Sequence, residues 1–191
     1  MNNKNKQMEQ ITPNIQEVVI QAQDGKLGAF TQLYEFFFLE IYRYTFVKIG
    51  NIQDAEDLTQ EIFLKVIKSI NKYREKGTPF SSWLFRIARN TIIDHLRKQQ
   101  KNMSIVPIEN ISELKSDNNL EKSAILALNI KEMKEQMDNL SELQKEVLIL
   151  RFFGQLSLEE TSKVISRNVN ATKNIQHSAL ASLRKKISKF N

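Results

Sequence analysis

The chain has 191 residues, with 28 Lys and Arg against 22 Asp and Glu, a formal charge of +6 and an isoelectric point near 9.4. It contains no cysteine, which excludes disulfides, thiolate metal sites and cysteine nucleophiles. Because the first residues are polar and no run of 18 apolar residues occurs, we expect a cytoplasmic protein with no membrane insertion of its own.

The first half of the chain predicts a helical module. Residues 1–13 are expected to form a disordered tail. Apolar residues then recur at i, i+3 and i+4 spacing, which is the pattern of helices that bury one face. Gly50 is expected to end one of these helices and Asp54 to cap the next, whose buried stripe includes Ile67. The predicted helices cover about 14–23, 29–48, 54–70 and 80–101.

The helix predicted over 80–101 separates apolar from basic residues. One face carries apolar side chains such as Leu84 and Ile92, and the opposite face carries several cations but a single carboxylate, Asp94. Ion pairs along the helix therefore cannot neutralise this face, and we expect it to bind an external anion. Trp83 lies at the boundary between the two faces, where its ring could seal the core or meet a base. The cations of the outer face are Arg86, Arg89, Arg97 and Lys101.

A change of pattern marks a domain boundary in the middle of the chain. Residues 101–119 show no sustained periodicity, contain Pro107 and become acidic, which is typical of a linker. We therefore predict an all-α protein with two helical domains, residues 14–100 and residues 120–191, joined by a flexible linker.

The second module predicts a helix-turn-helix. Ser141 with Gln144, and Ser157 with Glu160, have the spacing of capping boxes that open two helices. A turn near Ser166 then leads into a long basic helix, as in motifs that place their second helix in the major groove. Residues 141–191 carry a net charge of +5 and residues 77–101 a net charge of +4, so each module has its own basic region. An ordinary helical hairpin remains an alternative for this pair of helices.

Two segments in order resemble bacterial RNA polymerase sigma factors. "DAEDLTQEIFLKVI" with "FSSWLFRIARNTIIDHLRK" resembles their region 2, and "LSELQKEVLILRFFGQLSLEETSKVI" with "ALASLRKKI" resembles region 4. The absence of a further folded segment between them is similar to the extracytoplasmic-function class. This chain differs from the usual pattern at Ser166, where family members usually have Gly, and at Ile175 and Ser178, where they usually have Arg.

The resemblance implies four surfaces and their partners. The minus-10 promoter element would contact Trp83, Arg86, Arg89, Asn90, Asp94 and Arg97. The minus-35 element would contact Asn170, Thr172, Lys173, Asn174, Gln176, His177 and Arg184. The clamp of the polymerase β′ subunit would contact Asp54, Asp57, Gln60 and Glu61, and the β flap would contact Leu143, Val147, Leu150 and Phe153. An anti-sigma factor is implied as a further partner.

Two other functions compete with a promoter-specificity subunit. A stand-alone helix-turn-helix regulator would use the first module for dimerisation or sensing, and a helical adaptor would bind acidic proteins. An enzyme is not expected, because no Gly-rich phosphate loop occurs and neither His95 nor His177 has a second ligand at metal spacing. We accordingly expect no metal and no cofactor.

Overall fold

The computed structural model describes residues 14–103 and 135–187, and this part of the chain contains helices and no strand. The all-α prediction is therefore confirmed. The predicted tail over 1–13, most of the predicted linker and residues 120–134 lie outside the described residues. None of the described helices is long and apolar enough to cross a membrane. In chain order the helices are α1 (Ile15–Gln23), α2 (Leu27–Ile49), α3 (Ile52–Ser69), the 3-10 turn η1 (Ile70–Lys72), α4 (Phe80–Met103), α6 (Glu142–Phe152), α7 (Leu158–Val164) and α8 (Val169–Ile187).

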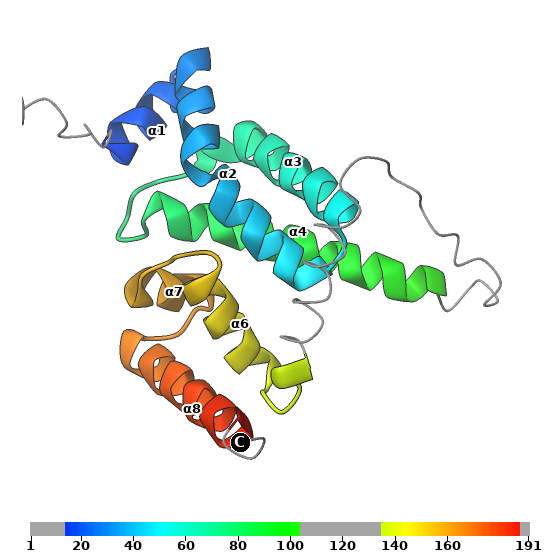
Figure 1. The fold of residues 1–191 in the computed structure, drawn as a ribbon. Coiled ribbons are helices and arrows are strands. Elements are labelled where there is room, and N and C mark those ends of the chain that lie inside the picture. The colour runs from blue at the N-terminus through cyan, green and yellow to red at the C-terminus, as the bar shows by residue number, and fades with distance from the viewer. Residues whose placement is uncertain (1–13, 104–134, 188–191) are drawn as a thin grey trace, which may run out of the picture.

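Helices α1 to α4 form the first module around a shared apolar core (Figure 1). Gly50 ends α2 with a left-handed φ of 85°, as predicted. The predicted cap of α3 is wrong, because the side chain of Asn51 accepts the hydrogen bond from the Asp54 N–H and Asp54 itself lies in the first turn. Ile67 is also not in the buried stripe, since 47% of its surface is exposed.

Helices α6, α7 and α8 form the second module, and local capping determines where α6 and α7 begin. Both predicted capping boxes are confirmed, with Ser141 and Gln144 opening α6 and Ser157 and Glu160 opening α7. The start of α8 is set by Asn168, whose side chain accepts a hydrogen bond of 2.7 Å from the Ala171 N–H.

The two modules pack against each other. In Figure 1, α6 and α7 lie directly beneath α2 and α4, with α8 on the far side of α6. The buried apolar residues of both modules belong to one cluster. Gly154 follows α6 and lies so close to α4 that a Cβ there would be 2.7 Å from Cε1 of Phe85. Phe85 is thereby buried although it lies outside the core face predicted for this helix.

Candidate nucleic-acid interface

The basic face of α4 is divided into two parts by the packing of the modules. In the first part, the Arg86 guanidinium donates to the Lys163 carbonyl oxygen at the end of α7, from Nε at 3.0 Å and from the terminal nitrogen at 2.5 Å. This carbonyl lies at the negative end of the α7 dipole, which favours a cation. Arg89 lies 3.5 Å from the carboxylate of Glu146. The prediction that the whole face awaits an external anion is therefore wrong for these two arginines, which have partners in the second module.

The second part of the face is open to solvent. Asn90, Arg97 and Lys101 are exposed, and the side chain of Arg97 is 72% exposed. Asp94 lies 3.8 Å from Arg97, and an exposed pair at that distance contributes little to stability. The cations of this half of α4 are therefore accessible from solvent without any rearrangement.

Trp83 belongs to an aromatic cluster at the start of α4. Its ring centroid lies 5.4 Å from that of Tyr73 and 5.5 Å from that of Phe80, and the side chain is half-buried. Burial raises the pKa of the Tyr73 hydroxyl, and the charge of Glu75 adds to the effect. The position of Trp83 at the edge of the core, predicted from the helical wheel, is thus observed.

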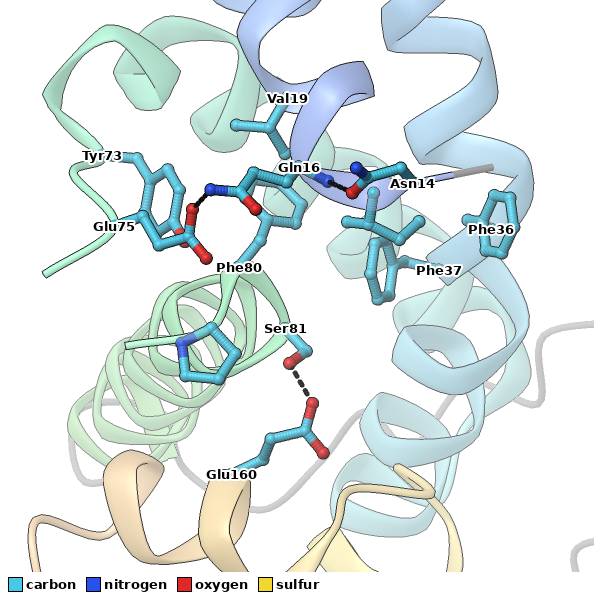
Figure 2. A pocket seen from close by; sticks show the side chains of 12 residues that line it. Asn14, Gln16, Val19, Phe36, Phe37, Tyr73, Glu75, Phe80, Ser81 and Glu160 are labelled. Atoms are coloured by element: carbon cyan, nitrogen blue, oxygen red, sulfur yellow. Dashed lines mark hydrogen bonds between the residues drawn. The ribbon is translucent and has the colours of Figure 1, made fainter. Parts of the chain in front are cut away.

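A cavity of about 400 Å³ lies beside this cluster, between α1, α2, the start of α4 and α7 (Figure 2). Its lower rim is polar, because the Ser81 hydroxyl donates to the Glu160 carboxylate there. Behind this rim the buried Ser82 hydroxyl donates to the Glu160 carbonyl at 3.2 Å. Partial burial opposes ionisation of Glu160, but hydrogen bonds from Ser81 and Ser157 and the charge of Arg151 outweigh it and lower the pKa of this carboxyl. Glu160 therefore remains a charged acceptor that joins α4 to α7.

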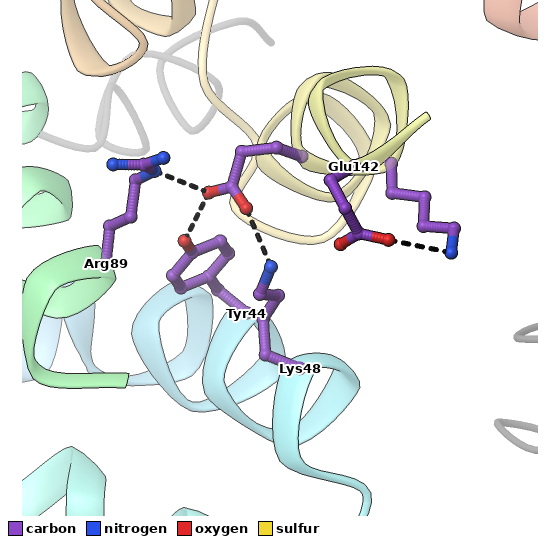
Figure 3. Close-up of polar contacts among 6 residues, drawn as sticks. Tyr44, Lys48, Arg89 and Glu142 are labelled. Carbon is purple, nitrogen blue, oxygen red and sulfur yellow. Dashed lines mark hydrogen bonds and ion pairs between the residues drawn. The ribbon is translucent and has the colours of Figure 1, made fainter. Parts of the chain in front are cut away.

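The carboxylate of Glu146 in α6 is the centre of a second polar contact between the modules (Figure 3). It accepts hydrogen bonds from the Tyr44 hydroxyl at 2.6 Å and from Lys48 Nζ at 2.7 Å, and it pairs with Arg89. Burial, and then the charge of Glu146 and its hydrogen bond, raise the pKa of Tyr44 well above its ordinary value, so this hydroxyl stays a donor. No sequence pattern predicts this cluster, because its members come from three helices in two modules.

On α8 most of the predicted DNA-contacting residues face solvent. Thr172 does not, since it is fully buried and its hydroxyl donates to the Asn168 carbonyl at 2.9 Å. Gln176 turns toward α6 and accepts a hydrogen bond of 3.1 Å from Arg151 Nε. We therefore leave Thr172 and Gln176 out of the candidate surface. The exposed residues are Asn170, Lys173, Asn174, His177 and Arg184.

The predicted flap-binding residues on α6 are largely enclosed. Val147 and Leu150 are fully buried, because α6 lies between α8 and the first module. Leu143 and Phe153 are half-buried. Leu150 lies on the side of α6 that faces the first module, as Glu146 does, whereas Val147 lies between Gln144 and Arg151, which both bond to α8.

The predicted clamp-binding residues lie on the outer side of α3. Asp57, Gln60 and Glu61 are exposed, and Asp54 is half-buried at the start of the helix. The same side continues into two exposed apolar residues, Leu64 and Ile67. Sequence reasoning missed this continuation, because it assigned Ile67 to the core. Among the described residues, no three His, Asp or Glu side chains gather closely enough to hold a metal ion.

Comparison with known families assigns both modules. Residues 33–102 match Sigma-70 region 2, and residues 137–185 match Sigma-70 region 4. The chain is also 31% identical to the ECF RNA polymerase sigma factor SigD of Mycobacterium tuberculosis over 175 residues, which cover 89% of this chain and 82% of SigD. The chain belongs to the ECF RNA polymerase sigma factors.

Two further similarities bear on this ECF sigma factor. It is 32% identical over 167 residues to BldN of Streptomyces coelicolor, an alignment that covers 87% of this chain but only 63% of BldN. In three dimensions it is similar to the sigma factor RpoE of Bartonella quintana, solved in complex with the anti-sigma factor NepR. The TM-score is 0.62 at 21% identity, over 85% of this chain and 98% of RpoE. This structural similarity supports the fold.

The turn before α8 contains a strained residue that departs from the usual sigma-factor pattern. Ser166, where Gly is usual, has a φ of 54°, in the left-handed region. We expect Ser166→Gly to raise the free energy of unfolding by about 0.5–1 kcal/mol, because relief of the left-handed strain exceeds the extra entropy of the unfolded chain. Urea denaturation of the full chain measures this difference.

The matched control is Ser182→Gly, which places the same change at an exposed position inside α8. This control should lower the free energy of unfolding by about 0.5 kcal/mol, because glycine is a poor helix former. If the Ser166→Gly protein unfolds more easily than the parent, the conclusion that Ser166 is strained at this turn is contradicted.

Proposed function

We propose that this ECF sigma factor is a cytoplasmic promoter-specificity subunit that directs core RNA polymerase to promoters with minus-10 and minus-35 elements. The observation that carries the proposal is the presence of region 2 and region 4, in order, in a single chain whose two modules each have a basic region. In this role the chain catalyses no reaction, since the polymerase forms the bonds.

The minus-10 element would bind along α4. Its exposed half, with Asn90, Asp94 and Arg97, presents cations and hydrogen-bonding groups on one side of a rigid helix. Trp83 supplies an aromatic face at the start of the same helix, and stacking on such a face suits an unpaired base. Arg86 and Arg89 would extend this surface once they leave their partners in the second module.

The minus-35 element would bind along the first turns of α8. Asn170, Lys173 and Asn174 are exposed there, and the asparagines can pair with adenine while the lysine contacts phosphate. His177 and Arg184 extend the exposed side further along the helix. Because the exposed side of α8 carries few cations, its contribution to the salt dependence of promoter binding should be modest.

Core polymerase would bind at two places. The β′ clamp would meet Asp57, Gln60 and Glu61, and the exposed Leu64 and Ile67 beside them supply the apolar area that a stable protein contact needs. The β flap would meet α6, through the predicted surface of Leu143, Val147, Leu150 and Phe153. Because Leu150 is fully buried on the side of α6 that carries Glu146 and faces the first module, full access to this surface would require the modules to part.

An anti-sigma factor would be the regulatory partner. The solved RpoE structure contains such a factor, and RpoE shares the fold of this chain. A protein that favours the packed arrangement of the two modules would keep Arg86, Arg89 and the α6 surface away from DNA and polymerase.

In vitro transcription from a randomised promoter library tests the proposed function. Core polymerase with the purified chain should yield transcripts whose promoters share two spaced elements, whereas core alone should not. The free chain should bind the selected promoters weakly. Tight, sequence-specific binding of the free chain to duplex DNA, without any effect on core, would instead favour a stand-alone helix-turn-helix regulator.

Two variants should separate DNA contact from polymerase contact. Arg97→Ala should reduce the salt slope of promoter binding by about one and leave core binding unchanged, because it removes one exposed phosphate contact. The double variant Asp57→Ala with Gln60→Ala should weaken core binding instead. Arg43→Ala, which removes an exposed arginine from α2, is the control and should change neither. Equal loss of both activities in Arg97→Ala would contradict the assignment of α4 to DNA.

A further inference from the structure

Glu146 is a buried carboxylate with no role in any of the four proposed surfaces. Its side chain is only 6% exposed, whereas that of Glu142, one turn earlier in the same helix, is 83% exposed. Burial of an ionised carboxylate is costly unless charges and hydrogen bonds compensate it. The compensation must therefore come from whatever α6 is packed against.

All three groups that compensate Glu146 belong to the first module. One carboxylate oxygen accepts from Tyr44 and faces Arg89, and the other accepts from Lys48 (Figure 3). Tyr44 and Lys48 lie one turn apart on α2, and Arg89 lies on α4, so one side chain of the second module joins two helices of the first. Without this packing, Glu146 would have to be hydrated or find other partners.

The Glu146 contact can hold the two modules together and still allow them to separate. The attraction within a buried ion pair is largely offset by the hydration that its members give up, so the net stabilisation is small. The hydrogen bonding of the Glu146 cluster is also incomplete, because Arg89 Nε is buried without a hydrogen bond in the described part of the chain. A contact of this kind allows a modest binding energy to shift the population between closed and open forms.

The closed form conceals groups that the proposed function requires. Arg89 is held by Glu146 itself, Arg86 is held by the end of α7, and Leu150, one turn after Glu146 on the same side of α6, lies fully buried. We infer that the Glu146 cluster is an autoinhibitory latch, which keeps the free chain closed and must open before core polymerase binds. The effect on polymerase rests on the proposed function, whereas the latch itself does not.

Glu146→Gln tests the latch, because it keeps the side-chain shape and removes the charge that Lys48 and Arg89 face. The chain has no cysteine, so spin labels can be placed at Gln32→Cys on α2 and Ser182→Cys on α8, which are both exposed. The labelled parent should give a single narrow distance distribution in the free chain. Glu146→Gln should broaden it toward longer distances and tighten core binding by about tenfold.

The control is Glu142→Gln on the same helix, whose only ion pair is the exposed one with Lys145 within the described residues. It should match the parent in both measurements. Circular dichroism must show unchanged helicity in each variant. If Glu146→Gln does not fold, Tyr44→Phe replaces it, because it removes only the hydroxyl from the cluster and should open the chain in the same direction by a smaller factor.

The outcomes separate the latch from the proposed function. Unchanged distances in Glu146→Gln, or in Tyr44→Phe where that variant is used, overturn the latch. Longer distances without tighter core binding overturn its autoinhibitory role. Failure of the parent and of every variant to bind core would refute the proposed function, and the distances would still decide whether Glu146 holds the modules together.

Discussion

A single buried carboxylate links two helices of the first module of this sigma factor to the second module. Glu146 accepts hydrogen bonds from two residues of α2 and faces Arg89 of α4, so the second module cannot shift unless this carboxylate becomes hydrated or finds other partners. The hydrogen bonds from α4 to Glu160 and Lys163 add a second polar contact around the same interface. Between them, the close approach of Gly154 to Phe85 brings the apolar surfaces together.

Helix α4 would therefore have two uses that exclude each other if it also binds DNA as proposed. In the closed arrangement the first half of the basic face of α4 is neutralised by protein groups, while Arg97 and Lys101 remain exposed. A phosphate backbone that bound the whole face would have to replace a helix-end carbonyl and a carboxylate. Competition between internal and external acceptors for the same arginines gives a physical basis for control of promoter binding without any change in the fold of either module.

The sequence predicted most of what depends on neighbouring residues, although it misplaced the cap of α3, and it missed what depends on packing between helices. Both capping boxes and the end of α2 at Gly50 are local, and they are where the pattern placed them. The helical pattern places Arg86 and Arg89 on an outer face and leaves Phe85 out of the core face, because all three meet the second module only after the two modules pack together. The burial of Thr172 and the inward turn of Gln176 likewise depend on helix packing that spacing alone does not define.

Reversible locking of the closed form would test this account most directly. Cysteines introduced as Ser81→Cys and Glu160→Cys, where the side chains meet across α4 and α7, can be joined by a short bismaleimide that contains a reducible bond. The account predicts that the bridged chain supports no promoter-dependent transcription with core polymerase and that reduction restores it. Equal transcription before and after reduction would contradict the claim that the packed arrangement is incompatible with function.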